Sequence, residues 1–209
     1  MKFSELAPLC QGTVIQIPLD IAIKDLAYDT RQLSIRSGVV FFAIKGAHHN
    51  GHSFIKEAYQ KGVRLFVTEE NDAIPADASV IQVQSGIEAM QALAAYRRAK
   101  YSIPVIGITG SNGKTIVKEW LTQLLSDQFD ILKSPKSYNS QLGVPLSVWP
   151  ISAHHNLAIF EAGISEKGEM ERLEKIIKPT HGIFTMIGAA HDINFKHQQE
   201  KLQEKLQLF

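Results

Sequence analysis

The stretch GITGSNGKT, residues 107–115, constrains the fold more than any other part of this sequence. It begins inside a short apolar run, PVIGIT (104–109), and leads into an amphipathic stretch, KTIVKEWLTQLLSDQF (114–129), so a buried strand, a glycine-rich loop and a helix follow one another. Glycines let such a loop curl with its backbone N–H groups toward a phosphate, and the helix N-terminus adds partial positive charge. The stretch therefore predicts a phosphate-binding loop.

The loop departs by one residue from the common pattern GxxxxGK[ST], whose first glycine would fall at Ile108 and not at Gly107. Lys114 is expected to reach the terminal phosphates of ATP, and the hydroxyl of Thr115 is expected to hold Mg²⁺. The alternative is a glycine-rich turn with a polar cap, but such a turn does not require Gly-Lys-Thr. The candidate nucleotide-binding residues are Gly110, Ser111, Asn112, Gly113, Lys114 and Thr115.

Short apolar runs rich in β-branched and aromatic residues recur along the chain and predict mostly buried strands. Between several of them apolar residues return every three or four positions, as in helices, most clearly at 87–101 and 114–129. This alternation predicts an α/β fold in which helices cover parallel strands. The expected strands are 13–17, 39–44, 63–68, 79–83, 104–109, 157–162 and 182–187.

Composition and charge narrow the class of protein. The chain is 44% hydrophobic and 21% charged, as globular proteins are, and 22 basic against 21 acidic residues give no reason to expect a nucleic-acid or membrane partner. Cys10 is the single cysteine, and the first residues show no signal-peptide pattern, which favours a reducing, cytoplasmic setting. The basic turn and proline of RRAKYSIP (97–104) predict a domain boundary near residue 102.

The motif TGSNGKT, with a glycine three residues before the glycine of GKT, resembles the loop of the Mur ligases, ATP-dependent enzymes that build the peptide stem of bacterial peptidoglycan. The resemblance extends through YDTRQLSIRSGVVFFAIKGAHHNGHSF (28–54), IFEAGISEKGEM (159–170) and IGAAHDINF (187–195). Within the family, KTIVKEW and SYNSQLGVPLSVW (137–149) are most similar to the MurF branch, which adds D-alanyl-D-alanine. SPKSYNSQLGVPLSVW together with EKLQLF is most similar to MurF fused to a downstream alanine racemase.

This resemblance implies a small N-terminal α/β domain, residues 1–101, that binds the UDP-MurNAc-peptide, followed by the first part of a P-loop ATPase-type parallel-sheet domain, residues 102–209. It implies that ATP phosphorylates the terminal carboxylate of UDP-MurNAc-tripeptide and that the amine of D-Ala-D-Ala attacks the acyl phosphate. Mur ligases continue into a C-terminal domain, so we expect this chain to be an N-terminal part that is inactive alone. The alternatives are the sibling ligase that adds the third stem residue and a non-catalytic nucleotide-binding module.

Two candidate metal ligands follow predicted strands. Glu161 lies at the end of the predicted strand in LAIFEA (157–162), just before Ala162, and His191 follows the next strand along the chain. Without the resemblance a solvated carboxylate at a strand end would be the commoner case for Glu161, and a structural role the commoner case for His191. Because the carboxyl ends of parallel strands meet at one edge of a sheet, both would converge with the phosphate loop. The resemblance implies that both bind Mg²⁺, although the family pattern TNIGxAH has an asparagine where this chain has Met186.

The last segment, QQEKLQEKLQLF (198–209), predicts a helix whose lysines, Lys201 and Lys205, share one face. Lysines are commonly exposed. The resemblance implies instead that one lysine is carbamylated by CO₂ and becomes a catalytic metal ligand beside Lys114, and alignment from His191 favours Lys205 over Lys201. Carbamylation requires the neutral amine, and a lysine four residues earlier would lower its pKa. The residues expected on the buried face of the helix are Leu202, Leu206 and Phe209.

The remaining candidate residues concern the substrate. Asn139 and Ser140 lie in SYNSQLG, where the resemblance implies contact with the growing peptide, although the family pattern NxNNxxG keeps only the first asparagine of its pair here. A helix N-cap is the alternative role. Asp29, Thr30 and Arg31 match a D[ST]R element that lines the uridine site in the family. The other residues implied for that site are Lys45, Asn50 and His52.

Overall fold

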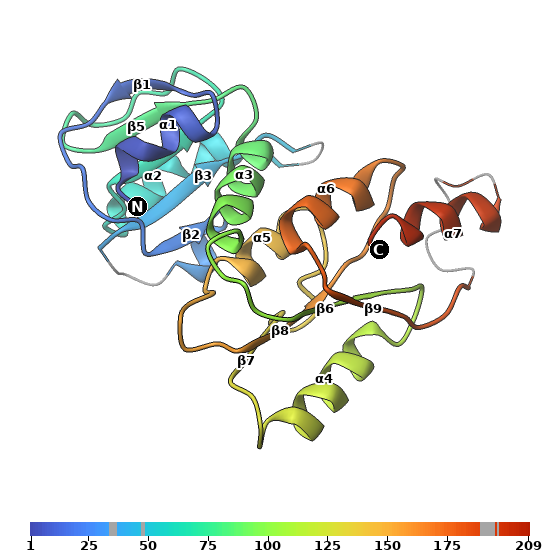
Figure 1. Ribbon diagram of the computed structural model, residues 1–209. Coiled ribbons are helices and arrows are strands. Elements are labelled where there is room, and N and C mark those ends of the chain that lie inside the picture. Colours follow the sequence, from blue (N-terminus) through green and yellow to red (C-terminus); the bar gives the residue numbers. More distant parts are fainter. Residues whose placement is uncertain (34–36, 47–48, 189–194, 196) are drawn as a thin grey trace. The chain divides into compact units, whose positions relative to one another are not determined.

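The computed structural model describes residues 1–33, 37–46, 49–188, 195 and 197–209 (Figure 1). They form two compact units, Met1–Leu93 and Ala94–Phe209. The division falls inside helix α3 (Gly86–Arg98), whereas residue 102 lies in the loop between α3 and strand β6 (Val105–Thr109). Both units combine parallel strands with helices, which confirms the predicted α/β class.

In the described residues, the first unit contains a five-stranded sheet in the order β1-β5-β4-β3-β2. Strand β1 runs antiparallel to β5, and the other neighbours are parallel. Apolar side chains from both faces of β3 and β4 are buried, and Phe41 meets Phe66 edge to face with ring centroids 6.2 Å apart. Its elements before α3 are η1 (Phe3–Glu5), α1 (Leu6–Leu9), β1 (Thr13–Gln16), β2 (Asp25–Ala27), η2 (Thr30–Gln32), β3 (Val39–Ala43), η3 (Gly51–Phe54), α2 (Ile55–Gln60), β4 (Leu65–Thr68) and β5 (Ser79–Gln82).

Strand β1 corrects one expectation from the sequence. The run TVIQI predicts a mostly buried strand, but Val14 and Ile15 are 47% and 48% exposed. The reason is that β1 lies at one edge of the sheet, and an apolar run does not reveal the position of its strand in the sheet order. The opposite edge strand, β2, has three residues and is too short to show a pattern in the sequence.

The second unit contains a parallel sheet in the order β7-β8-β6-β9. Strand β9 differs from the prediction of a mostly buried strand, because its first two residues are exposed and its last two are half-buried at the edge of the described sheet. The elements that follow α3 are β6, α4 (Lys114–Leu125), β7 (Ile131–Lys133), α5 (Gly143–Val148), β8 (Leu157–Glu161), α6 (Glu169–Ile177), β9 (His181–Phe184) and α7 (Gln198–Leu206).

Helices cover both faces of this sheet. Side chains alternate along β8, so Ala158 and Phe160 pack in the core beneath α5 and α6, while Leu157 and Ile159 contribute to a second core beneath Leu121 of α4. Figure 1 shows α4 on one side of the sheet and α5 and α6 on the other. The carboxyl ends of all the strands in this sheet therefore open at one edge, between these two layers.

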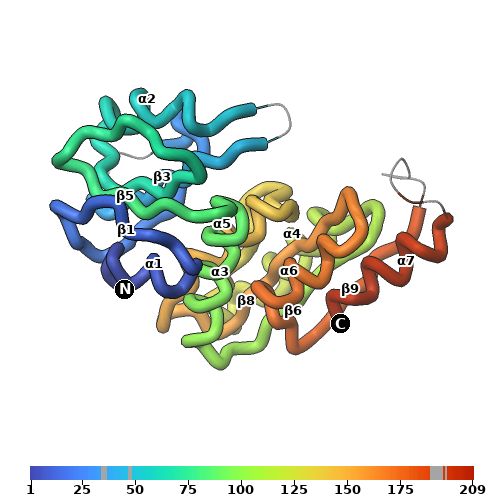
Figure 2. Tube along the Cα trace, turned by 90° about the horizontal axis from the view of Figure 1, so that it is seen from above, coloured from blue at the N-terminus to red at the C-terminus, as the bar shows by residue number. Residues whose placement is uncertain are grey.

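Helix α7 corrects the predicted orientation of the last helix. It lies beside α6, as Figure 2 shows. Lys201 and Lys205 are 1% and 2% exposed, whereas Leu206 and Phe209 are 46% and 53% exposed and Leu202 is half-buried. The periodicity identifies the helix, but the backbone carbonyls that accept hydrogen bonds from the two lysines come from distant parts of the chain and leave no local signal.

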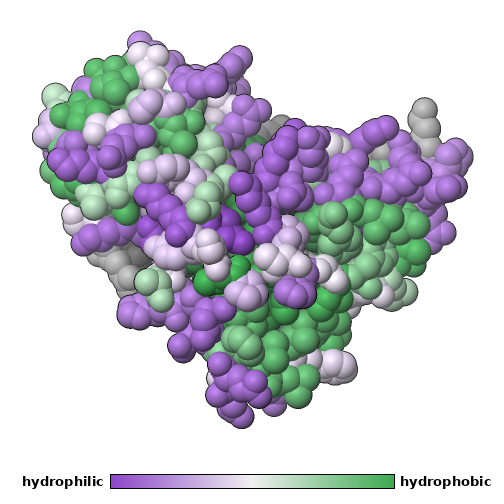
Figure 3. Space-filling model, viewed as in Figure 1, coloured by the Kyte–Doolittle hydropathy of each residue, from purple (hydrophilic) through white to green (hydrophobic). Residues whose placement is uncertain are grey.

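The outer face of α4 is apolar. Ile116, Trp120 and Leu124 recur every four residues and are 57%, 65% and 75% exposed. Figure 3 shows hydrophobic residues gathered on the surface over this helix. In the part of the chain that the structure describes, no helix combines the length and the apolar character that crossing a membrane requires.

Candidate functional site

The predicted phosphate loop joins β6 to α4 at the carboxyl edge of the sheet in the second unit. Gly110 and Gly113 have φ angles of +137° and +85°, in a region that glycine adopts without strain. A Cβ atom on Gly110 would lie 2.0 Å from Thr185 Oγ1, so the loop also passes close to the chain after β9. The glycines therefore curl the loop so that the N-terminus of α4 faces the open edge of the sheet.

The segment that follows β9 holds the loop in place. The N–H of Ser111 donates to Met186 O at 2.8 Å, the N–H of Gly188 donates to Ser111 Oγ at 3.0 Å, and Thr185 Oγ1 donates to Asn112 O at 2.6 Å. Ser111 thus uses both its N–H and its hydroxyl within the protein. Met186 contributes a backbone carbonyl, a group that any residue type could supply at the position where the family pattern has asparagine.

Three lysines converge on the backbone around this loop. Lys114 Nζ donates to Gly110 O at 2.8 Å, Lys205 Nζ donates to the same oxygen at 3.3 Å, and Lys201 Nζ donates to Gly188 O at 2.6 Å. Burial, together with the charges of Lys114 and Lys201, lowers the pKa of Lys205 to about 8. Burial also lowers the pKa of Lys114. The fold therefore brings together the two predicted catalytic lysines and the fallback lysine in a cluster of positive charge suited to phosphate.

We expect the stability contributed by Lys205 to increase as the pH rises from about 8 toward 10.5. The pKa of Lys205 is about 8 in the folded state and 10.5 in the unfolded chain, so the folded state loses its proton first. Burial of the charged amine therefore costs stability in full below about pH 8, and this cost disappears as the pH rises through that window. The difference in Tm between wild type and Lys205→Met should become more favourable to wild type between about pH 7.5 and about pH 9.5.

The control for this pH dependence is Lys175→Met, because Lys175 is exposed and pairs with Glu171 on the same helix. Its Tm difference from wild type should stay constant over the same range. A constant difference for Lys205→Met as well would contradict the lowered pKa of Lys205.

Glu161 lies at the end of β8, beside the phosphate loop. Its side chain is fully buried, and its Oε2 accepts a hydrogen bond from Thr115 Oγ1 at 3.0 Å. Its Oε1 lies 2.9 Å from Nζ of Lys118, which is also fully buried. Thr115 Oγ1 lies 3.1 Å from Ser137 Oγ. The predicted pair, a hydroxyl on the first turn of α4 and a carboxylate at the end of β8, is therefore assembled at the start of α4.

The oxygen atoms of Thr115 and Glu161 fit Mg²⁺, which proteins commonly hold through one or two side chains together with phosphate oxygens and water. A Mg²⁺ ion there would neutralise phosphate charge. Among the residues that the structure describes, no three His, Cys, Asp or Glu side chains gather as a metal site. The pair therefore depends on ligand oxygens to complete a coordination shell. The other predicted ligand, His191, lies outside the described residues.

Asn139 and Ser140 lie on the loop between β7 and α5, at the same edge of the sheet. The N–H of Gly163, just after β8, donates to Asn139 O at 2.8 Å and ties this loop to the strand end that carries Glu161. Ser140 Oγ accepts a hydrogen bond from the N–H of Gly143, the first residue of α5, at 3.1 Å. The residue before α5 is Leu142, and its side chain makes no capping hydrogen bond, so Ser140 contacts the start of the helix from two residues further away and not as its N-cap.

Candidate uridine residues lie in the first unit at the carboxyl ends of the parallel neighbours β2 and β3. Asp29 caps η2 and pairs with the guanidinium of Arg31 at 2.7 Å, and the side chain of Arg31 is 86% exposed. Thr30 is buried, and its carbonyl accepts a hydrogen bond from Lys61. Of Asp29, Thr30 and Arg31, Arg31 is the one whose charged group faces solvent.

The residues after β3 are engaged with the loop after β4. Lys45 Nζ lies 2.7 Å from Glu70, and Asn50 caps η3 through the N–H of His52. The His52 ring is buried, with Nδ1 2.6 Å from Asp72 Oδ2 and Nε2 4.0 Å from Glu69 Oε2. Sequence reasoning misses these acidic partners. The run EEND (69–72), directly after a predicted strand, is the signal that could have identified them.

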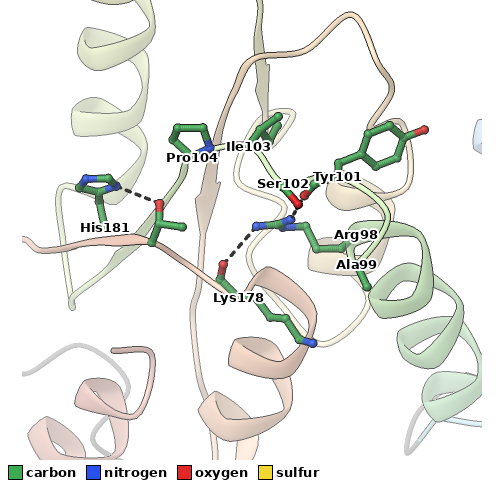
Figure 4. A pocket seen from close by; sticks show the side chains of 9 residues that line it. Arg98, Ala99, Tyr101, Ser102, Ile103, Pro104, Lys178 and His181 are labelled. Carbon is green, nitrogen blue, oxygen red and sulfur yellow. Dashed lines mark hydrogen bonds between the residues drawn. The ribbon is translucent and has the colours of Figure 1, made fainter.

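A pocket of about 550 Å³ lies at the other end of the second sheet, where β6 and β9 begin (Figure 4). Its most buried polar side chain is Arg98, which donates to the carbonyls of Ile177, Lys178 and Tyr101 at 2.9, 3.2 and 2.6 Å. These contacts join the C-terminal ends of α3 and α6. The guanidinium therefore has a structural role, at the edge of the sheet opposite the phosphate loop.

Comparisons with known families agree with the motifs in this site. Residues 22–98 match the family described as Mur ligase family, catalytic domain, and residues 108–209 match the Mur ligase middle domain. The chain is similar to the UDP-N-acetylmuramoyl-tripeptide--D-alanyl-D-alanine ligase of Synechocystis, with 36% identity over 87% of this chain and 40% of the relative. The enzyme of the same name from Treponema pallidum is 33% identical over 100% of this chain and 48% of the relative.

Solved structures give the same result. MurF from Acinetobacter baumannii superposes with a TM-score of 0.87 and 30% identity, over 98% of this chain and 45% of that protein. MurF ligase from Thermotoga maritima in complex with ADP has a TM-score of 0.78 and 28% identity, over 88% of this chain and 42% of that protein. The chain thus spans about half the length of the relatives that it matches.

Proposed function

Because the chain belongs to the Mur ligase family, we propose that it forms part of an ATP-dependent ligase that adds D-alanyl-D-alanine to UDP-MurNAc-tripeptide during synthesis of the peptidoglycan precursor. One observation carries this proposal. Lys114 and Thr115, the first residues of α4 after the glycine-rich loop, lie next to Glu161 at the end of β8, the parallel neighbour of the strand that precedes the loop. This arrangement suits ATP. The proposed acceptor, UDP-MurNAc-tripeptide, and the proposed amine, D-Ala-D-Ala, are taken from the names of the relatives.

In the proposed reaction, ATP phosphorylates the terminal carboxylate of UDP-MurNAc-tripeptide, and the amine of D-Ala-D-Ala then displaces phosphate from the acyl phosphate to form an amide. Charge neutralisation and alignment supply most of the catalysis in phosphoryl transfer. Lys114 provides a cation next to the N-terminus of α4, whose first backbone N–H groups have no partners inside the helix. ATP bound at this edge of the sheet would place its transferred phosphate close to Lys114 and to these N–H groups.

Thr115 and Glu161 are proposed as ligands of one Mg²⁺ ion, and His191 with carbamylated Lys205 as ligands of a second. The position of Lys205 supports this role, because its Nζ reaches the backbone oxygen of Gly110 at the phosphate loop itself. Lys201 remains the alternative site of carbamylation, with its Nζ directed at Gly188 O. When bound, the metal ions would offset the negative charge that develops on the phosphoryl group.

Residues 1–101 are proposed to bind the uridine nucleotide and residues 102–209 to form part of the ATP-binding domain. The uridine residues would be Asp29, Thr30, Arg31, Lys45, Asn50 and His52, and the peptide would pass near Asn139 and Ser140. The substrates are nucleotides and a dipeptide, so the proposed setting is the cytoplasm. A downstream alanine racemase in the complete protein is also part of the proposal, which the mass of the natural gene product tests.

We expect the 209-residue chain to bind UDP-MurNAc-tripeptide and Mg·ADP but to form no amide, because it spans less than half the length of its ligase relatives. Calorimetry measures binding, and chromatography after incubation with ATP, Mg²⁺, bicarbonate and both substrates measures product. Arg31→Ala should abolish the heat of UDP-MurNAc-tripeptide binding because this guanidinium is exposed to a ligand, and Arg172→Ala, an exposed arginine on α6, is the matched control.

Each outcome of these titrations has a meaning. Preference for UDP-MurNAc-dipeptide over the tripeptide would favour the sibling ligase that adds the third residue. Binding of ADP with no binding of either UDP-MurNAc-peptide would favour a non-catalytic nucleotide-binding module. Amide formation by the chain would show that the rest of the ligase is dispensable.

A further inference from the structure

Lys118 is the most deeply buried charged side chain of helix α4. It lies one turn after Thr115 and is 0% exposed. Its Nζ lies 2.9 Å from Glu161 Oε1 and 3.2 Å from Glu119 Oε1, and it donates to Ser134 O at 2.8 Å and to Lys136 O. Burial of a lysine is costly unless its charge is paired and its N–H groups are satisfied, and both conditions hold here.

The partners of Lys118 belong to the same network as the proposed Mg²⁺ ligands. One oxygen of Glu161 faces Lys118, while the other accepts the hydrogen bond from Thr115. The N–H of Glu161 donates to Ser134 Oγ at 3.1 Å, which joins the strand end to the loop after β7. A single ammonium group therefore touches the carboxylate and the loop at once.

The loop that Lys118 holds has a conformation that needs support. Lys136 has a φ angle of +50°, which costs a residue with a side chain about 1 kcal/mol. Its carbonyl is directed at Lys118 Nζ, and the next residue, Ser137, lies 3.1 Å from Thr115 through their hydroxyl oxygens. Asn139, a candidate substrate residue, follows two positions later. Without the ammonium group, the carbonyls of Ser134 and Lys136 would lose this donor. The N–H of Tyr138, which donates to Pro135 O at 3.1 Å, would still hold the turn, but this hydrogen bond makes no contact with the helix that carries Thr115.

We propose that Lys118 is a positioning residue of the ligase site, an inference that rests on the proposed function. It holds Glu161 so that one carboxylate oxygen faces Thr115, and it holds loop 134–137 against the phosphate-loop helix. Lys118 pairs with Oε1 of Glu161, and Oε2 is the oxygen on the side of Thr115, where the proposed Mg²⁺ ion would bind. The ion pair also compensates the charge of Glu161 when no metal is bound, so the buried carboxylate stays in place before Mg·ATP arrives.

The test compares ADP binding with and without Mg²⁺ in three variants of the chain. In wild type, Mg²⁺ should strengthen ADP binding measured by calorimetry. Lys118→Met, which keeps the length of the side chain but removes its charge and donors, should reduce that strengthening by about tenfold or more, the usual effect of losing a group that orients a metal ligand. Glu161→Gln should also reduce it, and Lys175→Met should leave it unchanged.

Hydrogen exchange of loop 134–137 separates positioning from a general loss of stability. Lys118→Met should speed exchange in this loop while helix α6, on the other face of the sheet, keeps its protection. Glu161→Gln should leave the loop protected, because Lys118 still donates to the carbonyls of Ser134 and Lys136. If Lys118→Met fails to fold, Lys118→Met combined with Glu161→Gln removes both charges together. Its loop exchange is then compared with that of Glu161→Gln alone: faster exchange in the double variant supports the role of Lys118, and equal exchange contradicts it.

These readouts distinguish a failure of the proposed function from a failure of the role of Lys118. Wild type that binds no ADP at all would overturn the proposed function. Wild type that binds ADP in an Mg²⁺-dependent manner, with Lys118→Met equal to Lys175→Met in both affinity and loop exchange, would overturn the role of Lys118 alone.

Discussion

Lys114→Ala is expected to lower the turnover of the complete ligase by about 100- to 1,000-fold, with little change in folded stability. The lysine offers a cation to the phosphates, and no other side chain on the loop can replace it. The fold tolerates its loss because Gly110 O, which accepts a hydrogen bond from Lys114, also accepts one from Lys205. Release of ADP measures turnover, and circular dichroism measures folding.

The matched control for this prediction is Lys175→Ala, a lysine that is exposed on α6 and remote from the phosphate loop. It should turn over at the rate of wild type. Near-normal ADP release from Lys114→Ala would mean that GITGSNGKT is a structural turn and does not act on phosphate.

Gly110→Ala is expected to lower the free energy of unfolding of the second unit by about 3 kcal/mol, or about 10 °C in Tm. Two effects add. The φ angle of +137° is strained for alanine, and the new Cβ would lie 2.0 Å from Thr185 Oγ1 and 3.1 Å from the backbone N and O of Met186. Because backbone atoms cannot rotate away as a side chain can, the loop or the segment after β9 must move.

Gly168→Ala is the matched control, since Gly168 also has a positive φ angle, +79°, but a Cβ there would meet nothing within 4 Å. It should lose about 1 kcal/mol through backbone strain alone. Both tryptophans, Trp120 and Trp149, lie in the second unit, so their fluorescence during urea unfolding reports on it. Equal stability of the two variants would contradict the close approach of Gly110 to Thr185.

Local features of the chain are sufficient to predict the class of fold and to identify the residues at the centre of the candidate site. The period of apolar residues distinguishes α3 and α4 from the strands around them, and both helices begin within one residue of the predicted starts. A phosphate loop requires a particular backbone conformation and a helix N-terminus. Both are local features, so the sequence shows them in Gly110, Gly113, Lys114 and Thr115. The position of Glu161 at a strand end is likewise visible in a run of a few residues.

Tertiary structure alone determines which faces and which partners these elements use. An apolar run such as TVIQI shows that a strand is present, but the sheet order decides that β1 lies at an edge. The pairing of His52 with Asp72 depends on chain segments that meet only because their strands belong to one parallel sheet.

The same reason explains the lysines of this protein. Lys118, Lys201 and Lys205 all look like exposed helix residues in the sequence, because lysine is normally solvated. Each is buried because carbonyl or carboxylate oxygens from other segments surround its ammonium group. Periodicity along one helix carries information about that helix, whereas the free energy of burying a charge depends on groups that come together only when the chain has folded.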